Sequence, residues 1–340
     1  MTNIRHLGRG HEAPAVFVDW VTVTQRHKGG GLPILVDGVC VWHDRNGLVR
    51  SERTSATSVT GSHDTAIRVG CDGGRVYLSG NVGRFSREDN LFNFGWAGTW
   101  ARCNRVLLGV GLPPFSSSPG FSDEDKQFGA RVSRLDITAN FATGNEGQAR
   151  AVIRWLSGQA IARVKRGQAG DESMWWSNTR KMFKAYLKGV ELMKHGMSED
   201  EVVVAWCKRL GIVRVEVELK RRLLRELGLQ QAEDITDEKL MRVFEEHTEI
   251  LRRVDRSDEP DILAHLPARS RVYAAAWLKG QDLTLMCHRA TLFRHAKVLR
   301  EYGIDILTPR NVIDFPIKVR VVDLQPVSAP DWYRRQMKAG

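Results

Sequence analysis

The chain has 340 residues, 42% hydrophobic and 27% charged, as expected of a globular protein with a substantial core. Because no stretch approaches the ~18 apolar residues of a membrane helix and no apolar segment precedes a cleavage site, we expect neither a membrane protein nor a signal peptide. The net charge of +11 favours a polyanionic partner, and five scattered cysteines without a CxxC pair indicate reduced thiols in a cytoplasmic protein.

Alternating β-branched and aromatic residues predict strands in the first half of the chain. Residues 16–24, "VFVDWVTVT", and residues 34–43, "ILVDGVCVWH", have this pattern. Residues 65–80 predict a hairpin whose turn is Asp72-Gly73-Gly74. A helix is expected over residues 99–112, and a further strand over 130–144.

The second half mixes helices with one sharply alternating strand. Residues 145–167 predict a helix with Asn145 as N-cap, and residues 198–211 a helix from Ser198 to Gly211. Residues 171–195 fit either a strand or a helix. In the strand from residue 213, one face carries Val213, Val215, Val217 and Leu219, and the other carries Arg214, Glu216, Glu218 and Lys220.

These elements predict an α+β protein of two domains. Residues 1–228 would form an antiparallel-sheet domain, 229–266 a helical linker and 267–340 a smaller helical domain.

The C-terminal part has the rhythm of a helix-turn-helix. Its first helix would pack through Leu283, Leu285 and Met286, and its second would start at Thr291 with Leu292, Ala296 and Leu299 facing the core. A helical bundle with a basic surface fits the same pattern. The outward side chains, suited to phosphates and guanine edges, would be Arg289, Arg294, His295, Lys297 and Arg300.

Acidic residues interrupt several of the predicted strands. Asp19 and Asp136 lie among apolar neighbours, and Glu216 and Glu218 share one strand face. Carboxylates of this kind hold the hard divalent cations used in phosphodiester cleavage. The alternative is that they occupy the solvent face of an antiparallel sheet, where such alternation is normal.

Among the five tyrosines, only Tyr186 is closely framed by cations. Lys184 and Lys188 stand two positions before and after it in "FKAYLKGVELMKH". A neighbouring ammonium lowers the pKa of a phenol and can neutralise a phosphate in the transition state. The alternative is a packing residue on a charged, solvated face.

Five segments in order resemble the replication initiators of filamentous phages, the gene II/gene X type of phage and plasmid replication protein. They are "FVDWVTVT", "LSGNVGRFSREDNLFNFG", "SRLDITANF", "KAYLKGVEL" and "VRVEVELKRRLL". The segment "LPARSRVYAAAWLKGQDLTLMCHRATLFRHAKVLREYGIDI" also looks like the C-terminal region of that family. The resemblance covers roughly residues 16 to 308.

The resemblance implies a rolling-circle nuclease-like catalytic domain with a helix-turn-helix-like DNA-binding domain. Such a protein nicks and rejoins one strand of double-stranded replicative DNA at an origin and leaves a 3′-hydroxyl primer. Tyr186 would be the nucleophile, Lys188 its electrostatic helper and Glu191 a supporting residue. Further contacts to DNA would come from Arg84, Lys184 and Arg214.

The same resemblance implies Mg²⁺ or Mn²⁺ held by Asp136 and Glu216, with Glu218 as second choice and Asp19 as a further candidate. The chain lacks the His-x-His ligand pair of many rolling-circle nucleases. Where some relatives show His-Asn, it has Asp89-Asn90, so Asp89 is another candidate ligand. Expected partners are double-stranded and single-stranded origin DNA and the host helicase and polymerase, in the cytoplasm of a bacterial host.

A different class of protein also fits, a non-enzymatic DNA-binding regulator of replication or transcription. An RNA-binding protein is disfavoured because no RRM-like or KH-like motif is present.

Overall fold

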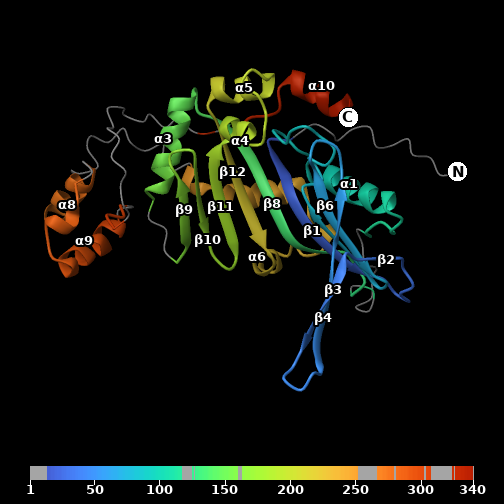
Figure 1. Cartoon of the computed structure of the whole chain (residues 1–340). Coiled ribbons are helices and arrows are strands. Elements are labelled where there is room, and N and C mark those ends of the chain that lie inside the picture. The colour runs from blue at the N-terminus through green and yellow to red at the C-terminus, as the bar shows by residue number, and fades with distance from the viewer. Residues whose placement is uncertain are drawn as a thin grey trace.

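The computed structural model describes residues 14–116, 125, 127–159, 163–251, 266–278, 281–301, 304–307, 324 and 326–339. Figure 1 shows a large sheet at the centre, helices packed around it, and the helices α8 and α9 beside its β9 edge. None of the helices among these residues is long and apolar enough to cross a membrane.

Ten strands of the described chain form one sheet in the order β2-β6-β7-β1-β8-β12-β11-β10-β9, with β5 paired to β6 beside this path. Every neighbouring pair runs antiparallel. The predicted α+β class with a large antiparallel sheet is therefore confirmed. The sheet strands are β1 Val16–Arg26, β2 Ile34–Leu35, β5 Thr57–Thr60, β6 Ala66–Asp72, β7 Arg75–Gly80, β8 Arg131–Ala142, β9 Lys165–Ala169, β10 Ser173–Ser177, β11 Lys181–Leu187 and β12 Ile212–Lys220.

Helices cover the apolar face of this sheet. Val21, Leu135 and Val217 belong to one buried cluster with Leu107 of α1 and Ile153 of α3. Helices α6 and α7 contribute further apolar side chains to that cluster. Burying such a face is the main source of stability for a sheet of this kind. The helices around the sheet are α1 Trp96–Gly109, α3 Glu146–Ser157, α4 Lys188–Lys194, α5 Val202–Leu210, α6 Arg221–Glu226, η1 Ala232–Asp234, α7 Asp237–His247 and η2 Glu249–Leu251.

Residues 171–195, which fitted either a strand or a helix, contain both. Strands β10 and β11 are followed directly by helix α4, which begins at Lys188. Phe183, Ala185 and Leu187 alternate into the core along β11. The junction therefore places Tyr186 at the end of a strand and Lys188 at the start of a helix.

Two other predicted helix boundaries differ from the structure. The helix from Asn145 ends at Ser157, because residues 165–169 form β9 at the sheet edge. Helix α5 is preceded by Glu201 rather than by Ser198, since the backbone N–H of Ser198 donates to the Glu201 carboxylate in the turn before it. Gly211 ends that helix with φ of 59°, as the sequence predicted.

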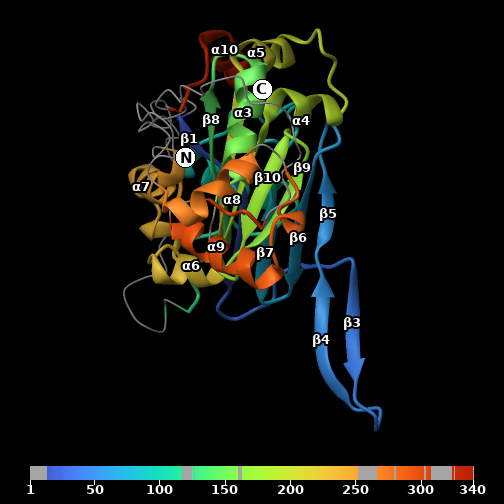
Figure 2. The same ribbon diagram turned by 90° about the vertical axis from the view of Figure 1, so that its left-hand side faces the viewer.

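A two-stranded ribbon projects from the body of the molecule (Figures 1 and 2). It consists of β3 Gly38–His43 and β4 Val49–Ser55, paired antiparallel to each other and outside the large sheet. The single strand predicted over residues 34–43 is therefore divided between β2 in the sheet and β3 in the ribbon.

The C-terminal region contains α8 Ala268–Leu278, η4 Leu283–Leu285, α9 Arg289–Glu301 and α10 Asp331–Ala339. Leu292, Ala296 and Leu299 of α9 are buried in a cluster with residues of α8, as predicted. The packing predicted for the first helix is wrong, since Leu285 is 86% exposed and Met286 42% exposed around a short 3-10 turn.

Helix α10 packs on the sheet part of the protein. Tyr333 lies in one apolar cluster with Phe17, Leu91 and Phe92. The N–H of Val327 donates to the carbonyl of Asn140 on β8. The boundary predicted at residue 267 stays a prediction, but the end of the chain contacts the surroundings of the predicted catalytic residues.

Candidate active site

Tyr186 meets a carboxylate across the strand pair β11–β12. Its hydroxyl donates to Oε1 of Glu216 at 2.5 Å, and Nζ of Lys184 lies 3.4 Å from Oε2 of the same carboxylate. Burial and then the Glu216 charge raise the pKa of Tyr186 well above its usual value. The expectation that neighbouring lysines lower this pKa is therefore wrong. The phenol is protonated at neutral pH and lies against a group that can accept its proton.

Lys188 lies near this pair as a fully buried cation. Its Nζ donates to Oδ1 of Asn90 at 2.6 Å and to Oε2 of Glu191 at 2.5 Å. Burial and the nearby Arg214 lower the pKa of Lys188. Although burial acts to raise the pKa of Glu191, the Lys188 charge holds it below its usual value. The structure thus joins Lys188 to Glu191, and neither hydrogen bond of Lys188 reaches Tyr186.

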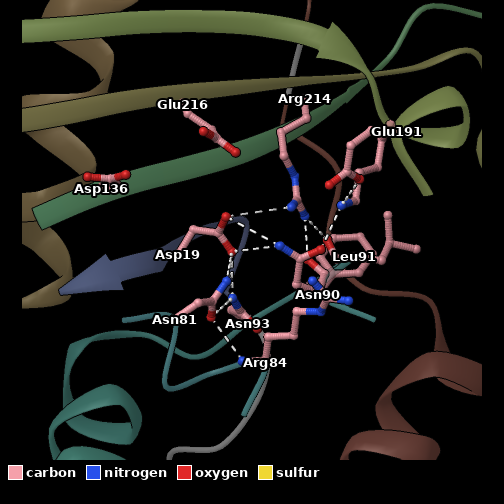
Figure 3. Close-up of polar contacts among 12 residues, drawn as sticks. Asp19, Asn81, Arg84, Asn90, Leu91, Asn93, Asp136, Glu191, Arg214 and Glu216 are labelled. Atoms are coloured by element: carbon pink, nitrogen blue, oxygen red, sulfur yellow. Dashed lines mark hydrogen bonds and ion pairs between the residues drawn. The ribbon is translucent and has the colours of Figure 1, made fainter. Parts of the chain in front are cut away.

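Asp19 is the centre of an amide network on the polar side of the sheet (Figure 3). Its Oδ1 accepts from Nδ2 of Asn81 at 2.9 Å, of Asn93 at 2.7 Å and of Asn90 at 3.2 Å. The β1–β8 register shifts between Val18 and Trp20, so Asp19 occupies a bulge. Bulges redirect a side chain locally, and this one turns Asp19 toward the 81–93 loop.

Arg214 is fully buried, which corrects the expectation that it contacts DNA directly. Its Nε donates to Oδ1 of Asn140 at 3.0 Å, and its Nη2 donates to the carbonyls of Asn90 and Leu91 at 2.5 and 2.6 Å. Its Nη1 lies 3.9 Å from Oδ2 of Asp19. Arg214 therefore positions the loop that carries Asn90, and its side chain is closed to solvent.

Three carboxylates lie together on β8 and β12. Glu218 pairs directly with Asp136, and Glu216 pairs with Thr138, two residues along β8. Arg134 binds Asp136 through Nη2 at 2.6 Å and lies 3.3 Å from Glu218. Burial raises the pKa of Asp136 to about 6, and Glu216 and Glu218 add to this effect. This group carries more negative charge than Arg134 alone can balance.

The donor chemistry of this carboxylate group suits a hard divalent cation. The hydroxyl of Thr138 is buried between Asp136 and Glu216 in the register and has no hydrogen-bond partner in the described chain. Such an orphaned oxygen fits a site that a metal-bound water would complete. In the residues that the structure describes, however, no three His, Cys, Asp or Glu side chains already converge as a metal shell.

The other two candidate ligands lie outside this carboxylate group. The Asp19 carboxylate is occupied by the asparagine amides, and Figure 3 shows it among them with Asp136 and Glu216 on the neighbouring strands. Asp89 accepts from the N–H of Leu91 at 2.7 Å and from the hydroxyl of Tyr333. The structure therefore does not gather all five predicted ligands.

The predicted DNA contacts differ in exposure. Arg289, Arg294 and Lys297 are exposed on α9. His295 is half-buried, with its ring stacked on Tyr273 at 4.3 Å and its Nδ1 2.9 Å from the Ser270 hydroxyl. Arg300 is exposed and lies 3.3 Å from Asp305, and Arg84 has a buried Nε in the 81–93 loop.

The sequence did not reveal the residues that hold this site together. They are Asn81, Asn93, Asn140, Thr138 and Tyr333. The available signal was the recurrence of asparagine at 81, 90 and 93 in the polar, glycine-containing segment after β7. Buried amides are normally paired, so such a run predicts a network, although it does not say with which strand.

Family models and curated relatives agree on what this chain resembles. Residues 17–238 match the family model for the N-terminal part of the replication-associated protein of phage gene II, and residues 263–338 match the model for its C-terminal part. The replication-associated protein of Enterobacteria phage I2-2 is 26% identical, with 93% of this chain and 96% of that protein covered. The replication-associated protein of Escherichia phage If1 is 26% identical, with 79% and 97% covered.

A solved rolling-circle replication initiator from Geobacillus stearothermophilus aligns with 64% of this chain and 78% of its own, at 13% identity and a TM-score of 0.29, a likeness too low to support an argument. The family models together span most of the chain, including the loop, the strands and the helix that build the site. The chain belongs to the family of phage replication-associated proteins of the gene II type.

Proposed function

We propose that this protein initiates rolling-circle replication by nicking and rejoining one strand of double-stranded replicative DNA at an origin. Family membership supports the role in replication. The observation that carries the chemistry is the 2.5 Å hydrogen bond from Tyr186 to Glu216. It pairs a nucleophile with a base, the arrangement that nucleophilic catalysis requires.

In the proposed step, Oη of Tyr186 attacks the phosphorus of the scissile phosphodiester while its proton passes to Glu216. The P–O3′ bond breaks, its electron pair stays on O3′, and that oxygen takes a proton from water to become the 3′-hydroxyl primer. A 5′-phosphotyrosine bond preserves the energy of the broken linkage. Attack by a 3′-hydroxyl on this bond reverses the step and rejoins the strand.

Cations around the tyrosine would offset the charge that develops on the phosphate. Lys184 is half-buried beside Glu216 and is the ammonium group best placed to reach a phosphate oxygen. Lys188 and Arg214 are buried, so we assign them to the positioning of Glu191 and the 90–91 backbone. Their charges still act on the site through a medium of low dielectric constant.

We propose Asp136 and Glu216 as ligands of Mg²⁺ or Mn²⁺, with Glu218 beside them, on the basis of their shared sheet face and the orphaned Thr138 hydroxyl. Such an ion, when bound, supplies Lewis-acid stabilisation of phosphate charge. Arg134 balances Asp136 and Glu218 in its absence. Asp19 and Asp89 are better explained as residues that position the 81–93 loop.

Helix α9 is the proposed duplex-binding element. Arg289, Arg294, Lys297 and Arg300 present basic side chains on its exposed surface. These are the residue types that contact phosphates and guanine edges. The 3′-hydroxyl and the displaced strand left by the reaction are the substrates that a host polymerase and helicase would use.

The test is incubation of the protein with Mg²⁺ and supercoiled DNA that carries the origin of the replicon encoding it. We expect open circles with protein attached covalently to the 5′ end at one position. Intact supercoiled DNA that only shifts in a gel would contradict the proposal and favour a non-enzymatic DNA-binding regulator.

A further inference from the structure

The polar face that carries Tyr186 continues across the sheet beyond the catalytic residues. Directly paired residues share a face, and the registers link Glu216 to Thr138 on β8, and Asp136 of the same β8 face to Trp20 on β1. Further along β1, Thr24 pairs with Tyr77 of β7. Because neighbouring strands lie about 4.8 Å apart, β7 is roughly 19 Å from β11 on this face.

An open cavity of about 360 Å³ lies at this far end, where the projecting ribbon joins the sheet. Thr24, Arg68, Arg75 and Tyr77 line it from strands β1, β6 and β7. Thr54 and Ser55 line it from the end of β4. The cavity therefore combines an aromatic ring, hydroxyl groups and two guanidinium groups on the same sheet face as the nucleophile.

The cations at the cavity lack carboxylate partners. Arg26, Arg68 and Arg75 are exposed, and none forms an ion pair with a described residue. The one acid in the lining, Asp72, accepts at Oδ1 from the backbone N–H groups of Gly74 and Arg75 in the β6–β7 turn.

The cations of the catalytic part differ in this respect. Arg134, Lys184 and Lys188 each lie within ion-pair distance of a carboxylate. Unpaired positive charge on this face is therefore concentrated around the cavity. A phosphate group is the ligand that such a charge distribution would attract most strongly.

We propose that the cavity binds one nucleotide of the single DNA strand that runs across the polar face from the scissile phosphate. Arg68 and Arg75 contact its phosphate, and Tyr77 stacks on its base. The volume is near the lower end of the ~300–1,000 Å³ range of small-ligand sites, so it suits one nucleotide and excludes a duplex. This inference rests on the proposed function, because it takes the DNA at Tyr186 as the source of the strand.

The separation of the two sites sets the length of DNA that should sense the cavity. At about 3.4 Å per nucleotide, roughly 19 Å corresponds to five or six nucleotides. A single-stranded oligonucleotide with about two nucleotides on each side of the scissile phosphate would occupy the Tyr186 site alone. One with about eight on each side would reach the cavity in whichever direction the strand runs.

The experiment compares the affinities of wild type, Arg68→Gln and Arg75→Gln for the short and long origin oligonucleotides over a series of salt concentrations. Arg222→Gln is the control, since Arg222 is exposed on α6, which packs on the apolar face. For the long oligonucleotide, we expect each cavity variant to bind about 3- to 10-fold more weakly, with a salt slope lower by about 0.7 for one lost phosphate contact. The short oligonucleotide should bind all four proteins equally.

Cavity variants that bind the long oligonucleotide as tightly as wild type, with an unchanged salt slope, would overturn the inference. Equal weakening on both oligonucleotides would also overturn it, because the arginines would then act at the Tyr186 site or through general charge. These readouts are of binding alone. They can therefore succeed or fail independently of whether the wild-type protein cleaves DNA.

Discussion

At the scale of single residues, the site pairs a reluctant nucleophile with a ready base. Burial and Glu216 keep the phenol of Tyr186 protonated, and the same carboxylate accepts its hydrogen bond at 2.5 Å. A phenol that ionised freely at neutral pH would need no base. This one does, so proton transfer to Glu216 is the step on which nicking depends in our proposal.

Glu216→Gln should therefore lower the rate of origin nicking about 10²- to 10⁴-fold, because an amide cannot accept the phenolic proton. DNA affinity should stay within a few-fold of wild type, as measured by titration of the single-stranded origin sequence. The exposed Glu199→Gln variant provides the control for the same chemical change. A Glu216→Gln protein that nicks at the wild-type rate would contradict the role of Glu216.

Asp136 makes a prediction about stability and pH. Its pKa is raised to about 6 by burial, so its contribution to stability is fully present below pH 4 and is lost as pH rises through 6. Asp136→Asn mimics the protonated form. At pH 8 the variant should have a free energy of unfolding higher by up to about 3 kcal/mol, and this gain should vanish near pH 4.

Urea denaturation at pH 8, 6 and 4 measures that difference, and a variant less stable than wild type at pH 8 would contradict it. Added Mg²⁺ should stabilise the wild type at pH 8 and leave Asp136→Asn unchanged if Asp136 is a metal ligand, since a bound ion stabilises only the state that binds it.

The sequence showed which side chains share a strand face but could not show what covers that face. Alternation along β12 correctly grouped Arg214, Glu216 and Glu218. It left open whether they meet solvent. The loop carrying Asn90 and Leu91 closes over Arg214 through contacts more than 120 residues apart in the chain, and no local pattern predicts such a contact.

At the scale of elements, the 81–93 loop is the part that connects the site. It brings Asn81, Asn90 and Asn93 to Asp19, and Asn90 also to Lys188. Helix α10 holds the same loop from outside. The hydroxyl of Tyr333 accepts from Arg87 at 2.9 Å and from the N–H of Phe92 at 3.2 Å, and it donates to Asp89.

Tyr333→Phe should thus affect both stability and catalysis. Removal of the buried hydroxyl leaves its partners on the loop unsatisfied, which costs about 1–3 kcal/mol in the free energy of unfolding. We expect the nicking rate at saturating DNA to fall more than the DNA affinity does, because the loop positions Asn90 and Lys188. Denaturation and single-turnover nicking measure the two effects.

The matched control is Arg335→Gln, an exposed position on the same helix. Equal loss of activity in both variants, or a Tyr333→Phe protein with wild-type stability, would show that the tyrosine does not hold the loop.

Strands were predicted more accurately than their ends. The hairpin turn at Asp72-Gly73-Gly74 and the strand through Asp136 stand where the local pattern placed them. The change from β11 to α4 at Lys188 has no capping side chain and no glycine or proline to mark it. It is set by packing, since Leu187 and Val190 belong to the same core cluster, and only the folded chain shows it.

At the scale of the whole molecule, one sheet organises the proposed functions. Its apolar face is covered by helices, and its polar face carries the carboxylates, the tyrosine and the cavity at the ribbon. Helices α8 and α9 lie beside the β9 edge, and the ribbon projects near the β6 end (Figure 1). The sequence predicted the sheet and the basic α9, whereas the ribbon and its cavity depend on pairings between distant segments.

The most direct test of the central claim is identification of the residue linked to DNA. The protein is reacted with origin DNA and Mg²⁺, the DNA is digested, and the remaining nucleotide adduct is located by peptide mass spectrometry, with Tyr186→Phe in parallel. We predict a 5′-phosphotyrosine at Tyr186 in the wild type and no adduct or nicked product in the variant. An adduct on Tyr77, Tyr273, Tyr302 or Tyr333, or nicking by Tyr186→Phe, would contradict the account.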